Sequence, residues 1–189
     1  MRDDLNTTEL GLVGMVAGRV LTALLVSVAI LSVSAGEALC AKDSPVSTSG
    51  LPIPRYVSLK SDHVNVRAGP TKDNDVAWVY TRSGLPVEIT AEFENWRRVR
   101  DSEGSEGWVY HSLLSGRRTA VVTMKTKDDL APIYDRADLT SGVAAKLQAG
   151  VVAQVKKCVG SWCRVIGTGF DGWIEQQRLW GVYADEKVD

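Results

Sequence analysis

After about residue 55 the chain alternates short apolar runs with turn residues, which is the pattern of β-strands. The clearest case is residues 87–93, VEITAEF, in which every second residue from Val87 to Phe93 is apolar. These four residues are expected to share one face of a strand, with the polar residues on the other. Residues 151–155, VVAQV, alternate in the same way. The pattern predicts an all-β fold.

Two segments of the chain repeat one another. Residues 94–114, ENWRRVRDSEGSEGWVYHSLL, and residues 160–180, GSWCRVIGTGFDGWIEQQRLW, each contain a Trp and then a Val three residues later. A polar break follows in both, and then a Gly-Trp pair with an aliphatic residue after it. The repeat length is about 66 residues, which indicates a tandem duplication of one small fold.

Each repeat has room for five short strands in roughly 60 residues, which suits a small closed barrel without exposed sheet edges. We therefore predict two five-stranded barrels in tandem, at 56–118 and 119–183, with an acidic tail at 184–189. Residues 42–55, KDSPVSTSGLPIPR, are rich in Ser and Pro and lack a hydrophobic period. They predict an extended linker.

The N-terminal part of the chain contains an uncharged apolar run at residues 20–36, which follows Arg19 and ends in small residues. This is the pattern of a secretory signal peptide. The run is shorter than the roughly 20 apolar residues that span a bilayer, so an uncleaved membrane anchor is the alternative. Cleavage is expected after Ala38 or Ala41, and Met15 is an alternative start of translation.

Residues 1–41 are thus expected to be a signal peptide or an anchor, and the folded part to lie in the periplasm, either free or held at the inner membrane. Without this segment the chain has 20 Lys and Arg against 19 Asp and Glu. Such a balance gives no broad basic field, so nucleic acid is not an expected partner. A membrane is expected to contact the protein only through the N-terminal segment, if that segment is uncleaved.

Several motifs of the first repeat together resemble a bacterial Src-homology-3 domain. They are VNVRAGP at 64–70, NWRRV at 95–99 and GWVYHSLL at 107–114. The second repeat keeps SWCRV and DGWI but reads APIYDRA in place of the opening motif. The arrangement resembles exported tandem Src-homology-3 proteins of alphaproteobacteria. The resemblance implies two Src-homology-3-like barrels that bind peptidoglycan or cell-wall peptides, with binding less expected for the second repeat.

Flat amphipathic side chains of the first repeat are the main ligand-binding candidates. Trp96 and Val99 have opposite parity on a strand, so an inward Val99 places Trp96 outside the barrel. Trp96 is then either a ligand platform or a cover for a gap between the barrels. Tyr80, Tyr110 and His111 are candidates to line a groove with it, because aromatic groups often dominate such sites.

Two further candidates, Asn65 and Arg67, are more readily explained as residues that fix the loop AGPTKDNDVA by hydrogen bonds than as ligand contacts. Trp108 and Trp173 each follow a Gly that permits close backbone approach, and core packing is the favoured interpretation of both.

Reactive groups are few. The two His residues, His63 and His111, lie in the first repeat, whereas the two Cys residues of the repeats lie in the second. The sequence contains no Cys-His nucleophile pair, zinc-protease helix motif or phosphate-binding Gly loop. We therefore predict neither enzymatic activity nor a cofactor nor a metal. The predicted function is a binding module for peptidoglycan, with a periplasmic protein–protein adaptor or accessory subunit as the alternative.

Cys158 and Cys163 are spaced as C-x4-C, without a second pair or clustered His residues that would complete a zinc site. A structural disulfide is favoured, since disulfides persist in exported proteins. A simple hairpin that pairs these residues would place Lys156 opposite Val165. We therefore expect a β-bulge in one of the two strands.

Overall fold

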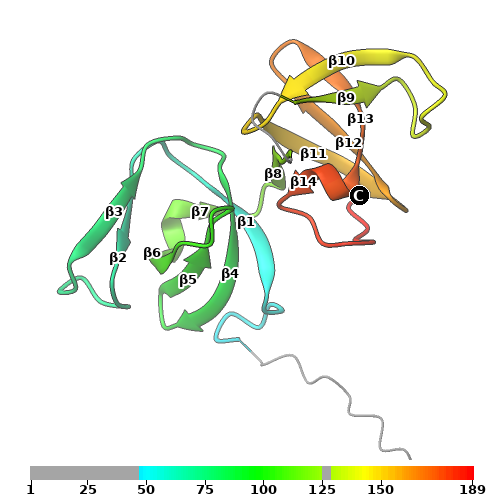
Figure 1. The fold of residues 1–189 in the computed structure, drawn as a ribbon. Helices are drawn as coiled ribbons and strands as arrows, with labels where there is room; N and C mark the ends of the chain where they lie inside the picture. Colours follow the sequence, from blue (N-terminus) through cyan, green and yellow to red (C-terminus); the bar gives the residue numbers. More distant parts are fainter. Residues whose placement is uncertain (1–46, 125–128) are drawn as a thin grey trace, which may run out of the picture. The chain divides into compact units, whose positions relative to one another are not determined.

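The computed structural model describes residues 47–124 and 129–189, so the predicted signal peptide or anchor lies outside the described residues. The described residues form two antiparallel sheets, one after the other along the chain, with no α-helix among them (Figure 1). No helix in this part of the chain is long and apolar enough to cross a membrane. The predicted all-β fold is confirmed.

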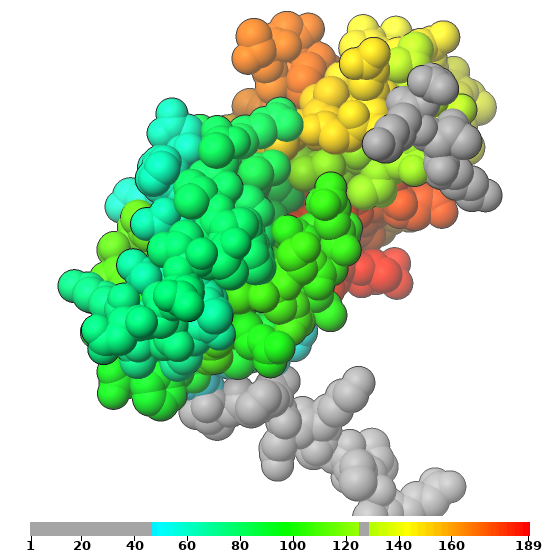
Figure 2. All heavy atoms as spheres, turned by 60° about the vertical axis from the view of Figure 1, so that its left-hand side comes forward, coloured from blue at the N-terminus to red at the C-terminus, as the bar shows by residue number. Residues whose placement is uncertain are grey.

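The first sheet has seven strands in the spatial order β3-β2-β6-β5-β4-β1-β7. The strands are β1 (Arg55–Leu59), β2 (Val64–Arg67), β3 (Val76–Tyr80), β4 (Pro86–Phe93), β5 (Trp96–Arg100), β6 (Glu106–Tyr110) and β7 (Leu114–Ser115), with the 3-10 helix η1 (His111–Leu113) before β7. In the space-filling view the atoms of this barrel, coloured cyan to green, pack closely on the face shown (Figure 2).

The second sheet repeats this order as β10-β9-β13-β12-β11-β8-β14. Its strands are β8 (Thr119–Val122), β9 (Leu130–Tyr134), β10 (Val143–Gln148), β11 (Val152–Val159), β12 (Trp162–Gly167), β13 (Phe170–Glu175) and β14 (Leu179–Trp180), with the 3-10 helix η2 (Gln176–Arg178) before β14. Because the two sheets place equivalent strands in the same order, the structure confirms the tandem arrangement. Each sheet has seven strands, two more than the five that we predicted.

Each barrel has a separate apolar core. The first core consists of side chains that point inward from five strands and is formed by Leu59, Val64, Val66, Val87, Ile89, Val99 and Val109. The second contains the equivalent strand residues and, in addition, both cysteines and residues from the C-terminal end of the chain. Burial of these side chains is the main force that holds barrels of this size together.

A bulge changes the strand predicted at residues 87–93. Ile89 pairs with Val99, but the next pair is Ala91 with Arg98, so Thr90 is an extra residue on β4. The bulge reverses the alternation, because the residue that follows it takes the opposite face. Ala91 and Phe93 therefore do not share the inward face of Val87 and Ile89 as we predicted, and Phe93 is 48% exposed.

The second barrel has its bulge at the equivalent place. Val155 pairs with Val165 and Lys157 pairs with Arg164, which leaves Lys156 unpaired on β11. The predicted bulge is thus confirmed. It brings Cys158 opposite Cys163, and their sulfur atoms are bonded with the Cα atoms 4.1 Å apart. The predicted disulfide is confirmed as well.

The two segments outside the repeats are bound to the ends of the β4–β5 and β11–β12 hairpins. In residues 47–54, the Ser49 amide donates to Glu92 at 2.8 Å and Ile53 is buried. In residues 184–189, Val188 joins the second core, and its carbonyl accepts a hydrogen bond from the Cys158 amide. Residues 47–54 and 184–189 therefore each supply a buried apolar residue and backbone hydrogen bonds.

The Gly of each Gly-Trp pair lies where a side chain has no room. A Cβ atom on Gly107 would lie 2.4 Å from Cγ1 of Val66 and 3.2 Å from the carbonyl oxygen of Arg67. A Cβ atom on Gly172 would lie 2.9 Å from the carbonyl oxygen of Tyr134. Neighbouring strands therefore approach closely at both positions, as expected from the Gly.

We expect Gly107→Ala to lower the free energy of unfolding by about 1–3 kcal/mol, because the added methyl must displace Val66 within a packed core. Gly116→Ala is the matched control, since no atom lies within 4 Å of the Cβ position there. Urea unfolding followed by circular dichroism measures both variants. Equal stabilities for the two would contradict the close approach.

Candidate binding face of the first barrel

The outward side chains of β4, β5, β6 and β2 form two rows on one face of the first barrel. Residues directly opposite each other on antiparallel strands share a face. The first row is Phe93, Trp96 and Tyr110, which pair in that order across β4, β5 and β6. The second row is Ala91, Arg98, Trp108 and Arg67. We call these two rows the outer aromatic face.

Trp96 lies on the face opposite to Val99, as its parity predicts, but its side chain is buried. Trp96 is 8% exposed, and its ring meets the ring of Tyr110 edge-on with centroids 5.4 Å apart. Tyr110 in turn lies 5.0 Å from the exposed His111 ring. The structure brings three of the candidate residues together, and the burial of Trp96 favours packing as its role.

Trp108 lies on the outer face between Arg98 and Arg67 and is only partly buried. We expected Trp108 in the core, but its two neighbours on β6 occupy the inward side. Val109 belongs to the core, and Gly107 lies close against Val66 and the backbone of Arg67. Because side chains alternate along a strand, Trp108 must point outward. It is the functional candidate that the sequence analysis missed, and the inward residues on either side are the signal that identifies it.

Arg98 and Arg67 are the register neighbours of Trp108 on β5 and β2. The Arg98 side chain is 47% exposed and forms an ion pair with Glu106. Arg67 donates from Nη1 to the carbonyl oxygen of Asn74 at 2.6 Å, which fixes the loop after β2 as expected. Asn65 lies two residues before Arg67 on the same side of β2. The face thus combines aromatic rings with hydrogen-bond donors.

Tyr80 is on the other side of the sheet, and the structure does not bring it to this face. It pairs with the buried Val64, packs against the core and donates from Oη to Oδ2 of Asp101 at 3.0 Å. Burial raises the pKa of Tyr80 above its usual value, and the negative charge of Asp101 adds to the effect. The hydroxyl is therefore a neutral donor that fastens β3 to the loop after β5.

Glu92, at the end of β4, lies between the outward residues Ala91 and Phe93 and holds the segment 47–54 from the other side of the sheet. Its side chain is only 1% exposed and contacts Arg55, Arg97 and the amide and hydroxyl of Ser49. Burial alone would raise the pKa of this carboxyl, but the hydrogen bonds from Arg55 and Ser49 outweigh it and lower the pKa to about 2. A buried charge with this many partners is a structural anchor rather than a reactive group.

We expect acid to weaken the first barrel through Glu92. A carboxyl whose pKa falls on folding contributes stability that is complete above its unfolded pKa, near 4.5, and is lost as the pH falls toward 2. Glu92→Gln should lower the free energy of unfolding at pH 7 by about 1–3 kcal/mol and flatten its pH dependence between 4.5 and 2. Urea midpoints at several pH values test this, with the exposed Glu103→Gln as control. An unchanged slope for Glu92→Gln would contradict the assignment.

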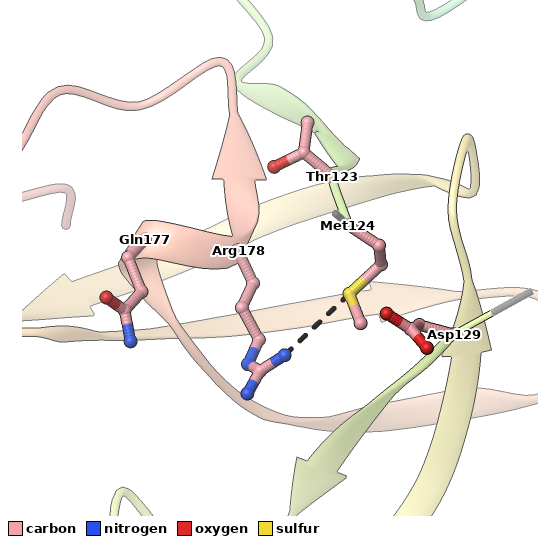
Figure 3. A pocket seen from close by; sticks show the side chains of 5 residues that line it. All are labelled: Thr123, Met124, Asp129, Gln177 and Arg178. Carbon is pink, nitrogen blue, oxygen red and sulfur yellow. Dashed lines mark hydrogen bonds between the residues drawn. The ribbon is translucent and has the colours of Figure 1, made fainter. Parts of the chain in front are cut away.

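The second barrel has an open pocket of about 570 Å³ lined by Thr123, Met124, Asp129, Gln177 and Arg178 (Figure 3). The guanidinium of Arg178 donates to Glu175 at 2.8 Å and points toward the Met124 sulfur, 3.7 Å away. The described lining residues include no Cys or His, so the pocket does not indicate nucleophilic chemistry. Nowhere in 47–124 and 129–189 do three or more Cys, His, Asp or Glu side chains gather in a group suited to a metal ion.

Comparison with known proteins agrees with the repeat. Residues 60–116 and 127–181 each match the family described as "Bacterial SH3 domain". The comparison with curated proteins found no match. Among solved structures, NlpC2 from Trichomonas vaginalis is 15% identical over 67% of this chain and 48% of its own, with a TM-score of 0.30. NlpC1 from the same organism is 16% identical over 71% of this chain and 48% of its own, with a TM-score of 0.31.

This chain thus spans about half the length of the two solved proteins. The family matches cover more than half of this chain and fall on the two sheets described above. The chain belongs to the bacterial SH3 domain family, a family of binding domains, and it carries two such domains in tandem.

Proposed function

We propose that the protein is an exported, non-catalytic module that binds peptidoglycan or its peptides through the outer aromatic face of the first barrel. The observation that carries this proposal is the position of Trp108, a partly buried residue of the outer face whose register neighbours on β5 and β2 are Arg98 and Arg67. Aromatic and Arg side chains dominate many binding sites, because they offer large contact areas and several donors at little cost in entropy.

The chemistry of peptidoglycan fits this face. Its sugar rings have flat apolar sides that stack on indole rings, and its stem peptides carry carboxylates. Arg98 already has an acidic partner in Glu106, but Arg67 forms no ion pair with any described residue. One cation beside Trp108 is therefore uncompensated, and a guanidinium binds carboxylates in a directed, charge-assisted way.

The disulfide supports export. Cys158 and Cys163 are bonded, and disulfides persist in compartments outside the reducing cytosol. The apolar run at residues 20–36, with Arg19 before it, supplies the signal for export or anchoring. We propose the periplasm as the location of the two barrels.

Substitutions on the face should separate binding from folding. Arg98→Gln removes one exposed guanidinium and one surface ion pair, so it should change stability by less than about 1 kcal/mol. Arg98→Gln and Trp108→Ala should each raise the Kd for purified, protein-free sacculi at least about tenfold in co-sedimentation, because each removes one contact of roughly 1.4 kcal/mol or more. Tyr80→Phe is the control, since Tyr80 lies away from the face.

Thermal melts accompany each binding measurement. Two folded variants that bind sacculi as tightly as the natural protein would overturn the assignment of the face. If the natural protein itself does not sediment with sacculi but is crosslinked to one envelope protein, the adaptor function replaces this proposal.

A further inference from the structure

The second barrel repeats the outer aromatic face in its strand register. Arg164 on β12 pairs with Trp173 on β13, and Trp173 pairs with Tyr134 on β9. In the first barrel the equivalent residues are Arg98, Trp108 and Arg67. The Arg–Trp pair is therefore present in both barrels at the same place, and like Trp108, Trp173 is partly buried outside the core.

The surroundings of the Arg–Trp pair are also repeated. Arg164 forms a bidentate ion pair with Asp171, two residues before Trp173. Arg98 likewise forms an ion pair with Glu106, two residues before Trp108, through one nitrogen and one oxygen. The Arg164 side chain is 50% exposed, close to the 47% of Arg98.

The first row of the face is repeated in a modified form. Trp162 takes the place of Trp96, and its ring meets the ring of Tyr134 edge-on with centroids 5.6 Å apart. An exposed apolar residue stands at the hairpin end in both barrels, Phe93 in the first and Val159 in the second.

The fold itself does not require the exposed Arg residues of this set or their acidic partners. A barrel needs apolar inward positions, but an exposed ion pair contributes little to stability. Where the two barrels differ, moreover, the differences lie at structural positions. The Glu92–Arg97 ion pair of the first barrel is replaced in the same register by the Cys158–Cys163 disulfide of the second. The hairpin ends thus diverged while the Trp–Arg–Trp set was retained.

We propose that the second barrel carries a second peptidoglycan-binding site formed by Trp162, Arg164, Trp173 and Lys157. This inference rests on the function proposed above for the first barrel. Charge supports the same ligand, because Lys157 pairs with Arg164 in register and, within the described part of the chain, forms no ion pair. Lys157 takes the register position of Ala91 in the first barrel, while Tyr134 takes that of Arg67. The second face therefore offers its cation beside Arg164, where an ammonium group can bind a stem-peptide carboxylate.

A soluble disaccharide-tetrapeptide released from peptidoglycan tests the proposal with the purified protein. Isothermal titration should give two molecules bound per chain. In nuclear magnetic resonance spectra, the indole N–H signals of Trp108 and Trp173 should both shift during the titration. The chemical shift of the Trp78 indole N–H should not change, because its ring packs on the core of the first barrel.

Variants assign the two sites. Trp173→Ala should lower the stoichiometry from two to one and leave the Trp108 shift intact, and Trp108→Ala should do the reverse. Arg164→Gln is a second variant that should fold normally, because the Arg164 side chain is 50% exposed. It should raise the Kd of the second site at least about tenfold.

The possible failures are distinguishable. One molecule bound per chain, with shifts at Trp108 but not at Trp173, overturns the second site and leaves the first in place. Absence of any binding overturns the function proposed for the first barrel and this inference with it.

Discussion

Replacing Trp96 by alanine is expected to lower the free energy of unfolding of the first barrel by about 3–5 kcal/mol. The residue is 8% exposed, and its ring is packed edge-on against Tyr110. Truncation of a buried indole removes its apolar contacts and leaves a cavity that the neighbours fill only in part. Urea unfolding monitored by tryptophan fluorescence measures the loss.

Phe93→Ala is the matched control, because Phe93 pairs with Trp96 in the same row but is 48% exposed. It should cost less than about 1 kcal/mol, as surface substitutions commonly do. If Trp96→Ala leaves the unfolding midpoint unchanged and abolishes binding to sacculi, Trp96 is a ligand platform and our assignment of a packing role fails.

Removal of the disulfide by Cys163→Ser should destabilise the second barrel by about 2–5 kcal/mol. Both cysteines are fully buried, so the variant also leaves a hydroxyl and a thiol in the apolar core. The C-terminal segment should loosen as well, since Val188 is bound to the backbone of Cys158. Hydrogen exchange should show faster exchange at residues 183–189 and unchanged exchange in the first barrel.

A thiol assay provides the control for this prediction. The denatured protein should gain two reactive thiols from Cys158 and Cys163 on reduction, and it should show neither of them before reduction. Alkylation of both residues without reduction would contradict the disulfide. Reduction of the natural protein should also lower the stability of the second barrel toward that of the variant.

The strand pattern predicted most of the fold, and it failed where local geometry departs from regular alternation. Val87 and Ile89 are inward as predicted, but the bulge at Thr90 turns Ala91 and Phe93 outward. The signal that identifies this bulge lies in the other repeat. The cysteine spacing predicts a bulge in one strand of that hairpin, and the structure places it at Lys156. The repeat length of about 66 residues transfers this position to Thr90.

The terminal segments make contacts that composition does not reveal. Composition predicted an extended linker and an acidic tail, because Ser and Pro are frequent in the first segment and acidic residues in the second. A single buried apolar residue in each, Ile53 and Val188, together with a few backbone hydrogen bonds, is sufficient to bind them to the barrels. Periodicity over so few residues gives no signal of such contacts.

The candidate site was predicted in part. The parity of Trp96 and the role of Arg67 could be read from the sequence, whereas the burial of Trp96 depends on how Tyr110 packs against it across the sheet. Trp108 was missed because a Gly-Trp pair suggests close packing for both of its residues. Only the Gly is closely packed, and the Trp beside it points outward.

The most direct test of the account is a binding isotherm of the purified protein on protein-free sacculi. Saturable co-sedimentation that soluble peptidoglycan fragments compete away, and that Trp108→Ala and Arg98→Gln weaken without unfolding the first barrel, is the result that we predict. The absence of co-sedimentation by the folded natural protein would contradict it.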